Sequence, residues 1–141
     1  MAGAGDSVEL AKAQYLAAWR WRRGVEKSLA PMKLTLTQWL VLEATASLIA
    51  ERDDAVNQNA VAARTELDRM TISQVMTTLA VRSLVDRAPD LDGRAYRIYL
   101  TQRGKRCVSR AARLVASATR HFRVCEDDRA KTRARRRAEP S

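Results

Sequence analysis

The chain has 141 residues, of which 46% are hydrophobic and 5% aromatic, and that is enough to bury the core of one domain. Its formal net charge of +10 favours an anionic partner, nucleic acid or a membrane surface, while two cysteines, three prolines and five glycines argue against a disulfide framework or an all-β fold. No apolar run is long enough to span a bilayer and the first residues lack a secretory signal, so we expect a cytoplasmic protein with no membrane partner.

The first part of the chain predicts two helices. Asp6 and Glu9 have the spacing of a capping box, and the helix that they open should end before Pro31, because a residue that precedes proline avoids the helical conformation. Thr35 and Gln38 form a second capping box, which predicts a helix over residues 36–51. The apolar positions of the first helix include Val8, Leu16, Trp19, Val25 and Leu29. The predicted buried stripe of the second is Leu36, Leu40, Ala44 and Leu48.

The middle of the chain predicts a winged helix-turn-helix over about residues 57–101. Asn57 is a good N-cap for a short helix over residues 58–64, with Val61 and Ala62 facing inward, and Asp68 is one for a helix over residues 69–82. The second helix has a clean one-sided pattern of Ile72, Val75, Met76 and Leu79. A strand over residues 84–87, a polar turn and a second strand then predict a hairpin, with Tyr96, Ile98 and Leu100 on one buried face.

Thr101 is the predicted cap of the last helix, which should continue to about residue 125. Beyond Glu126 the apolar residues vanish and residues 131–137 are mostly basic, so the pattern predicts a frayed or disordered tail. Residues 101–141 carry 13 Lys and Arg against 4 Asp and Glu, whereas residues 51–100 carry 7 against 8. The basic excess therefore lies in the last helix and tail and not in the helix-turn-helix.

The outer face of the second helix of this motif favours DNA. No Asp or Glu occurs between Arg69 and Val85, and a helix that reads a groove cannot present carboxylates to phosphates. Gln74 can pair with adenine, and an arginine at a hairpin tip, Arg94, is suited to the minor groove, with Asp92 able to hold it. The competing interpretation is an ordinary solvated helix beside a surface turn.

These segments resemble the MarR (multiple antibiotic resistance regulator) family. The order and spacing from Val56 to Arg87 match its helix-turn-helix, and Asp92-x-Arg94 followed by Leu100-Thr101-x-x-Gly104 matches its wing. The run Leu34–Trp39 looks like the opening of its second helix, and the likeness covers about residues 8–125. The resemblance implies a mainly α, winged-helix (α+β) fold of five to six helices with a small β-hairpin wing. It also implies a homodimer, joined by the first and last helices, that binds a pseudo-palindromic operator and commonly represses transcription.

We therefore expect one integrated domain, made of an N-terminal dimerisation helix (1–34), a winged DNA-binding region (35–101), a C-terminal dimerisation helix (102–126) and a basic tail (127–141). The predicted DNA contacts are Asn57, Arg69, Met70, Thr71, Ser73, Gln74, Thr77, Thr78, Asp92, Arg94 and Arg97. The chain departs from the family at Glu66 and Ser83, where glycine is frequent, and at Gln74, where arginine is common. These departures concern the shapes of two turns and the base preference.

The resemblance also implies a small effector, since members of this family often bind aromatic or phenolic anions between the dimer helices and the winged domain. The candidate lining residues are Tyr15, Trp19, Arg22, Trp39 and His121. The alternative is that these aromatic residues fill the core and the dimer interface.

Other residues of the sequence are compatible with functions besides DNA binding. Cys107 and Cys125 lie 18 residues apart, roughly 27 Å along one straight helix, so only an intersubunit disulfide could make the protein a redox-responsive regulator. A winged-helix protein-interaction adaptor is a further alternative. With one histidine and no metal-ligand cluster, Gly-rich phosphate loop or nucleophile motif, the sequence predicts no enzyme, no metal and no cofactor.

Overall fold

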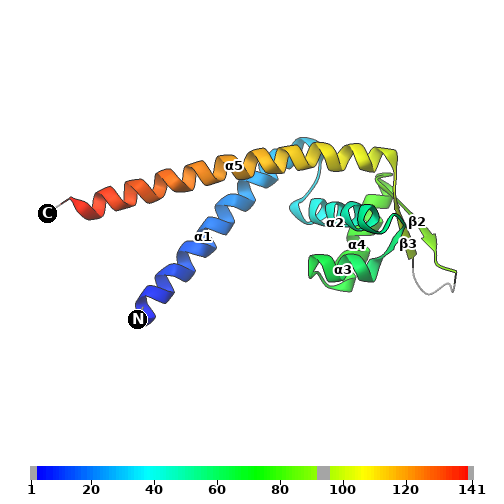
Figure 1. The fold of residues 1–141 in the computed structure, drawn as a ribbon, viewed down its shortest axis with the longest axis horizontal. Coiled ribbons are helices and arrows are strands. Elements are labelled where there is room, and N and C mark those ends of the chain that lie inside the picture. The colour runs from blue at the N-terminus through cyan, green and yellow to red at the C-terminus, as the bar shows by residue number, and fades with distance from the viewer. Residues whose placement is uncertain (1–2, 92–95, 140–141) are drawn as a thin grey trace.

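A computed structural model describes residues 3–91 and 96–139, and Figure 1 shows the arrangement of the chain. The elements in order are α1 (Ala4–Leu29), the 3₁₀ turn η1 (Ala30–Met32), α2 (Leu36–Arg52), β1 (Val56–Asn57), α3 (Gln58–Thr65), α4 (Arg69–Val81), β2 (Val85–Pro89), β3 (Tyr96–Leu100) and α5 (Gln102–Ala138). The expectation of a mainly helical winged-helix fold is confirmed.

The two long helices α1 and α5 cross near the C-terminal end of α1 and then diverge toward the two chain termini, while α2, α3, α4 and the sheet gather at the other end of α5 (Figure 1). Two side-chain contacts fix the crossing. The Trp21 indole Nε1 donates to the Thr119 hydroxyl at 3.0 Å, and the Arg20 guanidinium makes a two-pronged ion pair with the Glu126 carboxylate at 2.7 and 2.9 Å.

The start of α1 differs from the prediction. The helix begins at Ala4 with Gly3 as its N-cap, and the Asp6 carboxylate accepts from the Gly3 N–H at 3.3 Å. Asp6 thus lies within the first turn, where its charge favours the helix dipole, and does not open a box with Glu9. At the other end, Pro31 sits inside η1, because the first positions of a helical turn need no N–H donor.

Helix α2 opens with the predicted capping box. The Gln38 N–H donates to the Thr35 hydroxyl at 3.0 Å, and the Thr35 N–H donates to the Gln38 side-chain oxygen at 3.1 Å. The predicted stripe is only partly right, because Ala44 and Leu48 are buried while Leu36 and Leu40 are half-buried. Contacts with α1, α3, α4 and α5 bury further residues of α2, so its covered surface is wider than one stripe. Those residues are Val41, Leu42 and Thr45.

The helix-turn-helix follows the prediction to within a residue at each end. Ile72, Met76 and Leu79 of α4 are fully buried against the core, as is Val61 of α3. Each cap is made as expected, since the Asn57 side chain accepts from the Ala60 N–H at 2.8 Å and the Asp68 side chain accepts from the Thr71 N–H at 2.8 Å.

The wing is a three-stranded antiparallel sheet with the order β1-β3-β2, and not a simple hairpin. The added strand pairs Val56 with Ile98 and Asn57 with Arg97. Two residues are too few to show an alternating pattern, so the sequence could not reveal this strand. The predicted buried face was also too long, because Ile98 is buried but Tyr96 is 48% exposed where the sheet projects beyond the core.

Helix α5 continues to Ala138, well past residue 125, so the expectation of a frayed tail is corrected. Alanine, arginine and lysine are strong helix formers, and neither glycine nor proline interrupts residues 105–139. Helix α5 leaves the core after Ala118 and contacts α1 as far as Glu126, so the loss of apolar residues beyond that point reflects the end of burial and not the end of the helix. Among the described residues, no helix is both long and apolar enough to cross a membrane.

Candidate nucleic-acid interface

Helix α4 presents a polar, acid-free face to solvent. Its buried residues occupy one side, and Arg69, Met70, Ser73, Gln74, Thr77 and Thr78 are all exposed on the other. Met70, the one large apolar residue of this set, is 72% exposed. The face combines a methionine, small hydroxyls and one amide, and it carries no negative charge that would repel phosphates.

Two of the predicted DNA contacts also hold the local fold. Asn57 caps α3, and the half-buried Thr71 hydroxyl donates to the Asp68 carboxylate at 2.7 Å. Bonds from the Thr71 N–H and hydroxyl lower the pKa of Asp68, because they stabilise its charged form. Asp68 and Thr71 therefore hold the first turn of α4, whereas Asn57 holds the first turn of α3.

Thr77 and Thr78 donate their hydroxyls to the carbonyls of Ser73 and Gln74 one turn earlier, at 2.9 and 3.2 Å. Each hydroxyl oxygen keeps a lone pair for an outside donor. The side chains of Ser73 and Gln74 make no hydrogen bond within the described part of the chain, so these two are the most available for base edges.

Arg87 of β2 is a residue that the sequence analysis missed at this face. Its guanidinium donates to the Ser73 carbonyl and to the Thr77 hydroxyl, both at 3.0 Å, and lies 5.4 Å from the Tyr96 ring centroid. It therefore ties the wing to the middle of α4 and adds positive charge beside the polar face. Its place in a strand that alternates inward and outward residues gave no signal of this contact.

The remaining wing residues divide into two groups. Arg97 of β3 donates to the Asp54 carboxylate at 2.8 Å, and this bond lowers the pKa of Asp54. The Arg97 guanidinium is therefore already paired with a carboxylate of the protein. Asp92 and Arg94, the predicted minor-groove pair, lie outside the described residues.

The two turns that flank α4 keep the shape that glycine favours. Glu66 precedes α4 with φ 59° and Ser83 follows it with φ 59°, both in the left-handed region. The two turns therefore keep their left-handed conformation without glycine. Because a residue with a Cβ is strained in that conformation, Glu66 and Ser83 each carry backbone strain.

The five candidate effector residues do not meet in one pocket of a protomer. Tyr15 is 71% exposed on α1, Trp19 lies under the Arg23 guanidinium at 4.6 Å, and Arg22 pairs with Glu26 at 2.9 Å. Trp39 packs against the core. Of the five, only His121 lines the pocket of about 320 Å³ between α1 and α5.

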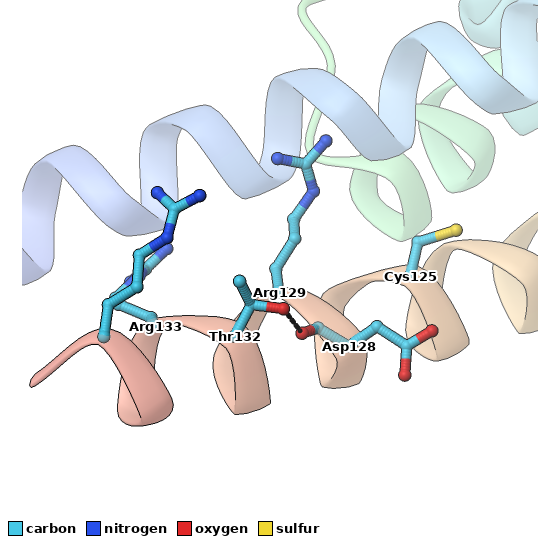
Figure 2. Close-up of a pocket in the computed structure, with 6 residues that line it drawn as sticks. Cys125, Asp128, Arg129, Thr132 and Arg133 are labelled. Atoms are coloured by element: carbon cyan, nitrogen blue, oxygen red, sulfur yellow. Dashed lines mark hydrogen bonds between the residues drawn. The ribbon is translucent and has the colours of Figure 1, made fainter. Parts of the chain in front are cut away.

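That pocket is basic and partly aromatic. Its other lining residues are Arg20, Arg23, Gly24, Lys27, Ala118, Phe122, Cys125, Glu126 and Arg129. A second hollow continues along α5, and Figure 2 shows Arg129 and Arg133 extending from α5 toward α1 across it. Both hollows lie where the two long helices diverge.

Both cysteines are free and half-buried on the same helix. Burial raises the pKa of the Cys107 thiol, although the nearby arginines, Arg82, Arg103 and Arg110, oppose that effect. The Cys125 sulfur lies 3.6 Å from His121 Nε2.

Comparisons with protein-family models and with curated protein sequences find no match, whereas solved structures do match. A MarR-family transcriptional regulator from Rhodococcus sp. RHA1 superposes with a TM-score of 0.69 at 26% sequence identity, covering 95% of both chains. The PcaV transcriptional regulator from Streptomyces coelicolor gives 0.63 at 28% identity, covering 85% of this chain and 90% of that one. Bordetella bronchiseptica BpsR, a protein whose DNA binding is regulated by 6-hydroxynicotinic acid, gives 0.68 at 22% identity, covering 79% and 78%.

The fold and the exposed face of α4 therefore define a winged helix-turn-helix of the DNA-binding type. Structural neighbours across most of the chain are MarR-family transcriptional regulators, and this chain has their fold. The resemblance stated from the sequence is confirmed. Regulators of this family are not enzymes.

Proposed function

We propose that this protein is a cytoplasmic, sequence-specific transcriptional repressor that binds a pseudo-palindromic operator as a homodimer. The observation that carries the proposal is the exposed, acid-free face of α4, where Ser73 and Gln74 are free to meet base edges. The positive N-terminal end of α4 and Arg87 beside the face would supply phosphate contacts.

The dimer has support from the exposed apolar residues of the diverging helices. Five large hydrophobic side chains of α1 and one of α5 are about half exposed or more in the single chain. They are Val8, Leu10, Tyr15, Leu16, Trp19 and Val124. Exposed apolar residues that cluster where α1 and α5 diverge are suited to burial by a second copy of the chain. That second copy also supplies the second winged DNA-binding domain of the dimer.

The DNA test uses a fragment that flanks the protein's own gene and contains an inverted repeat. Ser73→Asp places a carboxylate on the exposed face of α4 and should weaken binding in a gel shift roughly 100-fold, because like charges brought together across an interface cost several kcal/mol. Ser109→Asp makes the same change on the exposed surface of α5 and should bind as the wild type does. Equal binding by both variants would reject α4 as the reading helix.

We further propose that an aromatic or phenolic acid releases the protein from DNA by binding between α1 and α5. The support is a pocket that joins the Phe122 ring to cationic groups such as Arg23 and Lys27. A panel of phenolic acids should weaken the gel shift, and Arg23→Gln should blunt that response without changing DNA affinity. Unchanged responses in the variant would exclude this pocket.

A further inference from the structure

A second cleft, separate from the α4 face and from the α1–α5 pocket, lies where η1, the end of α4 and the start of α5 meet. It measures about 630 Å³, and five of its lining side chains are basic: Lys33, Arg82, Arg103, Arg106 and Arg110. Pro31, Met32, Leu84 and Cys107 complete the lining, so none of the described lining residues is acidic or aromatic.

The cations are brought together by tight backbone contacts. A Cβ on Gly104 would collide with the Leu84 carbonyl oxygen, so the first turn of α5 lies directly against the chain that leaves α4. The Thr101 hydroxyl reinforces this contact by bonding to the Ser83 carbonyl at 2.7 Å. Across the cleft, Arg82 donates to the carbonyls of Lys33 and Met32 at 2.8 and 2.9 Å, which fixes its guanidinium as one wall.

Over residues 3–91 and 96–139, no carboxylate pairs with this cluster. In the described part of the chain, none of the five basic residues takes part in an ion pair. Arg103 also occupies the first turn of α5, which holds no acidic residue, so its charge adds to the positive end of a 37-residue helix. Cations placed together against the helix dipole repel one another, and a bound anion would relieve that repulsion.

We infer that this cleft is a binding site for a small phosphorylated or pyrophosphate-containing anion. Arginine forks match phosphate oxygens two at a time, and five cations suit a ligand with several negative charges. The cleft has no ring to stack on, so it does not suit an aromatic acid. It adjoins the C-terminal end of α4, roughly 20 Å along the helix from the turn that faces DNA, and this inference does not depend on DNA binding.

Cys107 offers a reporter for the test. It lines the cleft, whereas Cys125 lies about five helical turns further along α5. Cys125→Ser and Cys107→Ser variants each leave one thiol to react with iodoacetamide. At constant ionic strength, inorganic pyrophosphate should slow alkylation of Cys107 severalfold more than alkylation of Cys125, which lines the other basic pocket.

Charge-matched variants show whether the protection comes from the cleft. Arg103→Gln with Arg106→Gln, or Arg110→Gln alone, should weaken pyrophosphate binding measured by calorimetry roughly tenfold for each arginine lost. Arg113→Gln with Arg120→Gln removes the same charge from exposed positions on α5 outside the cleft and should leave binding unchanged.

Two outcomes would overturn the inference. The first is the absence of binding, or equal weakening in the cleft and control variants, which would indicate general attraction to a basic surface. The second is protection of Cys107 by duplex DNA but not by pyrophosphate, which would make the cleft a nucleic-acid contact.

Discussion

Single residues around α4 show how the chain fixes the position of a recognition helix. Asp68 holds the first turn through Thr71, Arg87 holds the middle, and Arg82 ties the end to η1. The sequence indicates the first of these contacts through local cap chemistry. The other two come from residues 14 and 49 positions away from their partners and depend on the fold.

Glu66 tests the cost of a left-handed turn at the residue scale. Because its φ is 59°, Glu66→Gly should raise the free energy of unfolding by about 0.5–1 kcal/mol, the left-handed strain being partly offset by the freedom of glycine in the unfolded chain. Glu66→Ala keeps the strain and should bring no gain. Urea denaturation measures both, and a stabilised alanine variant would contradict the backbone argument.

The Asp68 cap predicts a pH dependence. Its folded pKa lies below the ordinary value of 3.8, so its stabilising contribution is full above about pH 4 and is lost as the pH falls through the folded pKa. Asp68→Asn should therefore be less stable than the wild type at pH 7, with the difference shrinking below pH 4. The midpoints of denaturant unfolding measure the stability of both proteins at each pH. A stability difference that stays constant from pH 7 to below pH 4 would show that the charge of Asp68 is not involved.

At the scale of elements, the junction between β3 and α5 depends on Gly104, where the helix meets Leu84 without room for a side chain. Gly104→Ala should lower the free energy of unfolding by roughly 1–3 kcal/mol, because either the strand end or the helix must shift. The control is Gly24→Ala in α1, where a Cβ would meet nothing within 4 Å, and this change should stabilise the helix by about 0.5–1 kcal/mol. Thermal denaturation measures the stability of both variants. Opposite changes would show that close packing at Gly104 outweighs the gain in helix propensity from alanine.

At the scale of the whole molecule, α1 and α5 form two diverging arms with uncovered apolar residues (Figure 1). Leu16→Glu would place a charge in the proposed dimer interface, where Leu16 is 51% exposed in the single chain. We expect this variant to elute as a monomer in size-exclusion chromatography with light scattering, whereas the exposed Gln14→Glu should remain dimeric. Two dimeric variants would place the interface elsewhere.

The Leu16 variant also links assembly to function. Separate monomers should bind an operator half-site far more weakly than the dimer binds the full site. In the dimer, binding of one winged domain holds the other at a high effective concentration near the second half-site, and the monomer lacks this effect. Leu16 lies in the exposed part of α1, whereas α1 joins the core of the winged domain through Val25 and Leu29 near its C-terminal end, so the fold of that domain should survive the change (Figure 1). Circular dichroism checks that survival.

The sequence by itself determined the elements whose signals are local. The caps at Thr35, Asn57, Asp68 and Thr101 follow from side-chain chemistry within three residues, and the one-sided pattern of α4 follows from helical periodicity. The acid-free face of α4 is likewise a property of the sequence, and the MarR-like fold could be expected from these segments together.

Only the tertiary structure decided the features that join distant residues. These features are the pairing of β1 with β3, the hydrogen bond from Arg87 to α4 and the ion pair of Arg97 with Asp54. The arrangement of five basic residues around one cleft is a further example. The tertiary structure also showed that α5 continues after its apolar residues end. The length of a helix depends on the helix propensity of its residues, whereas the pattern of apolar residues indicates only which of them are buried. Contacts between residues far apart in the sequence produce no periodic pattern from which they could be predicted.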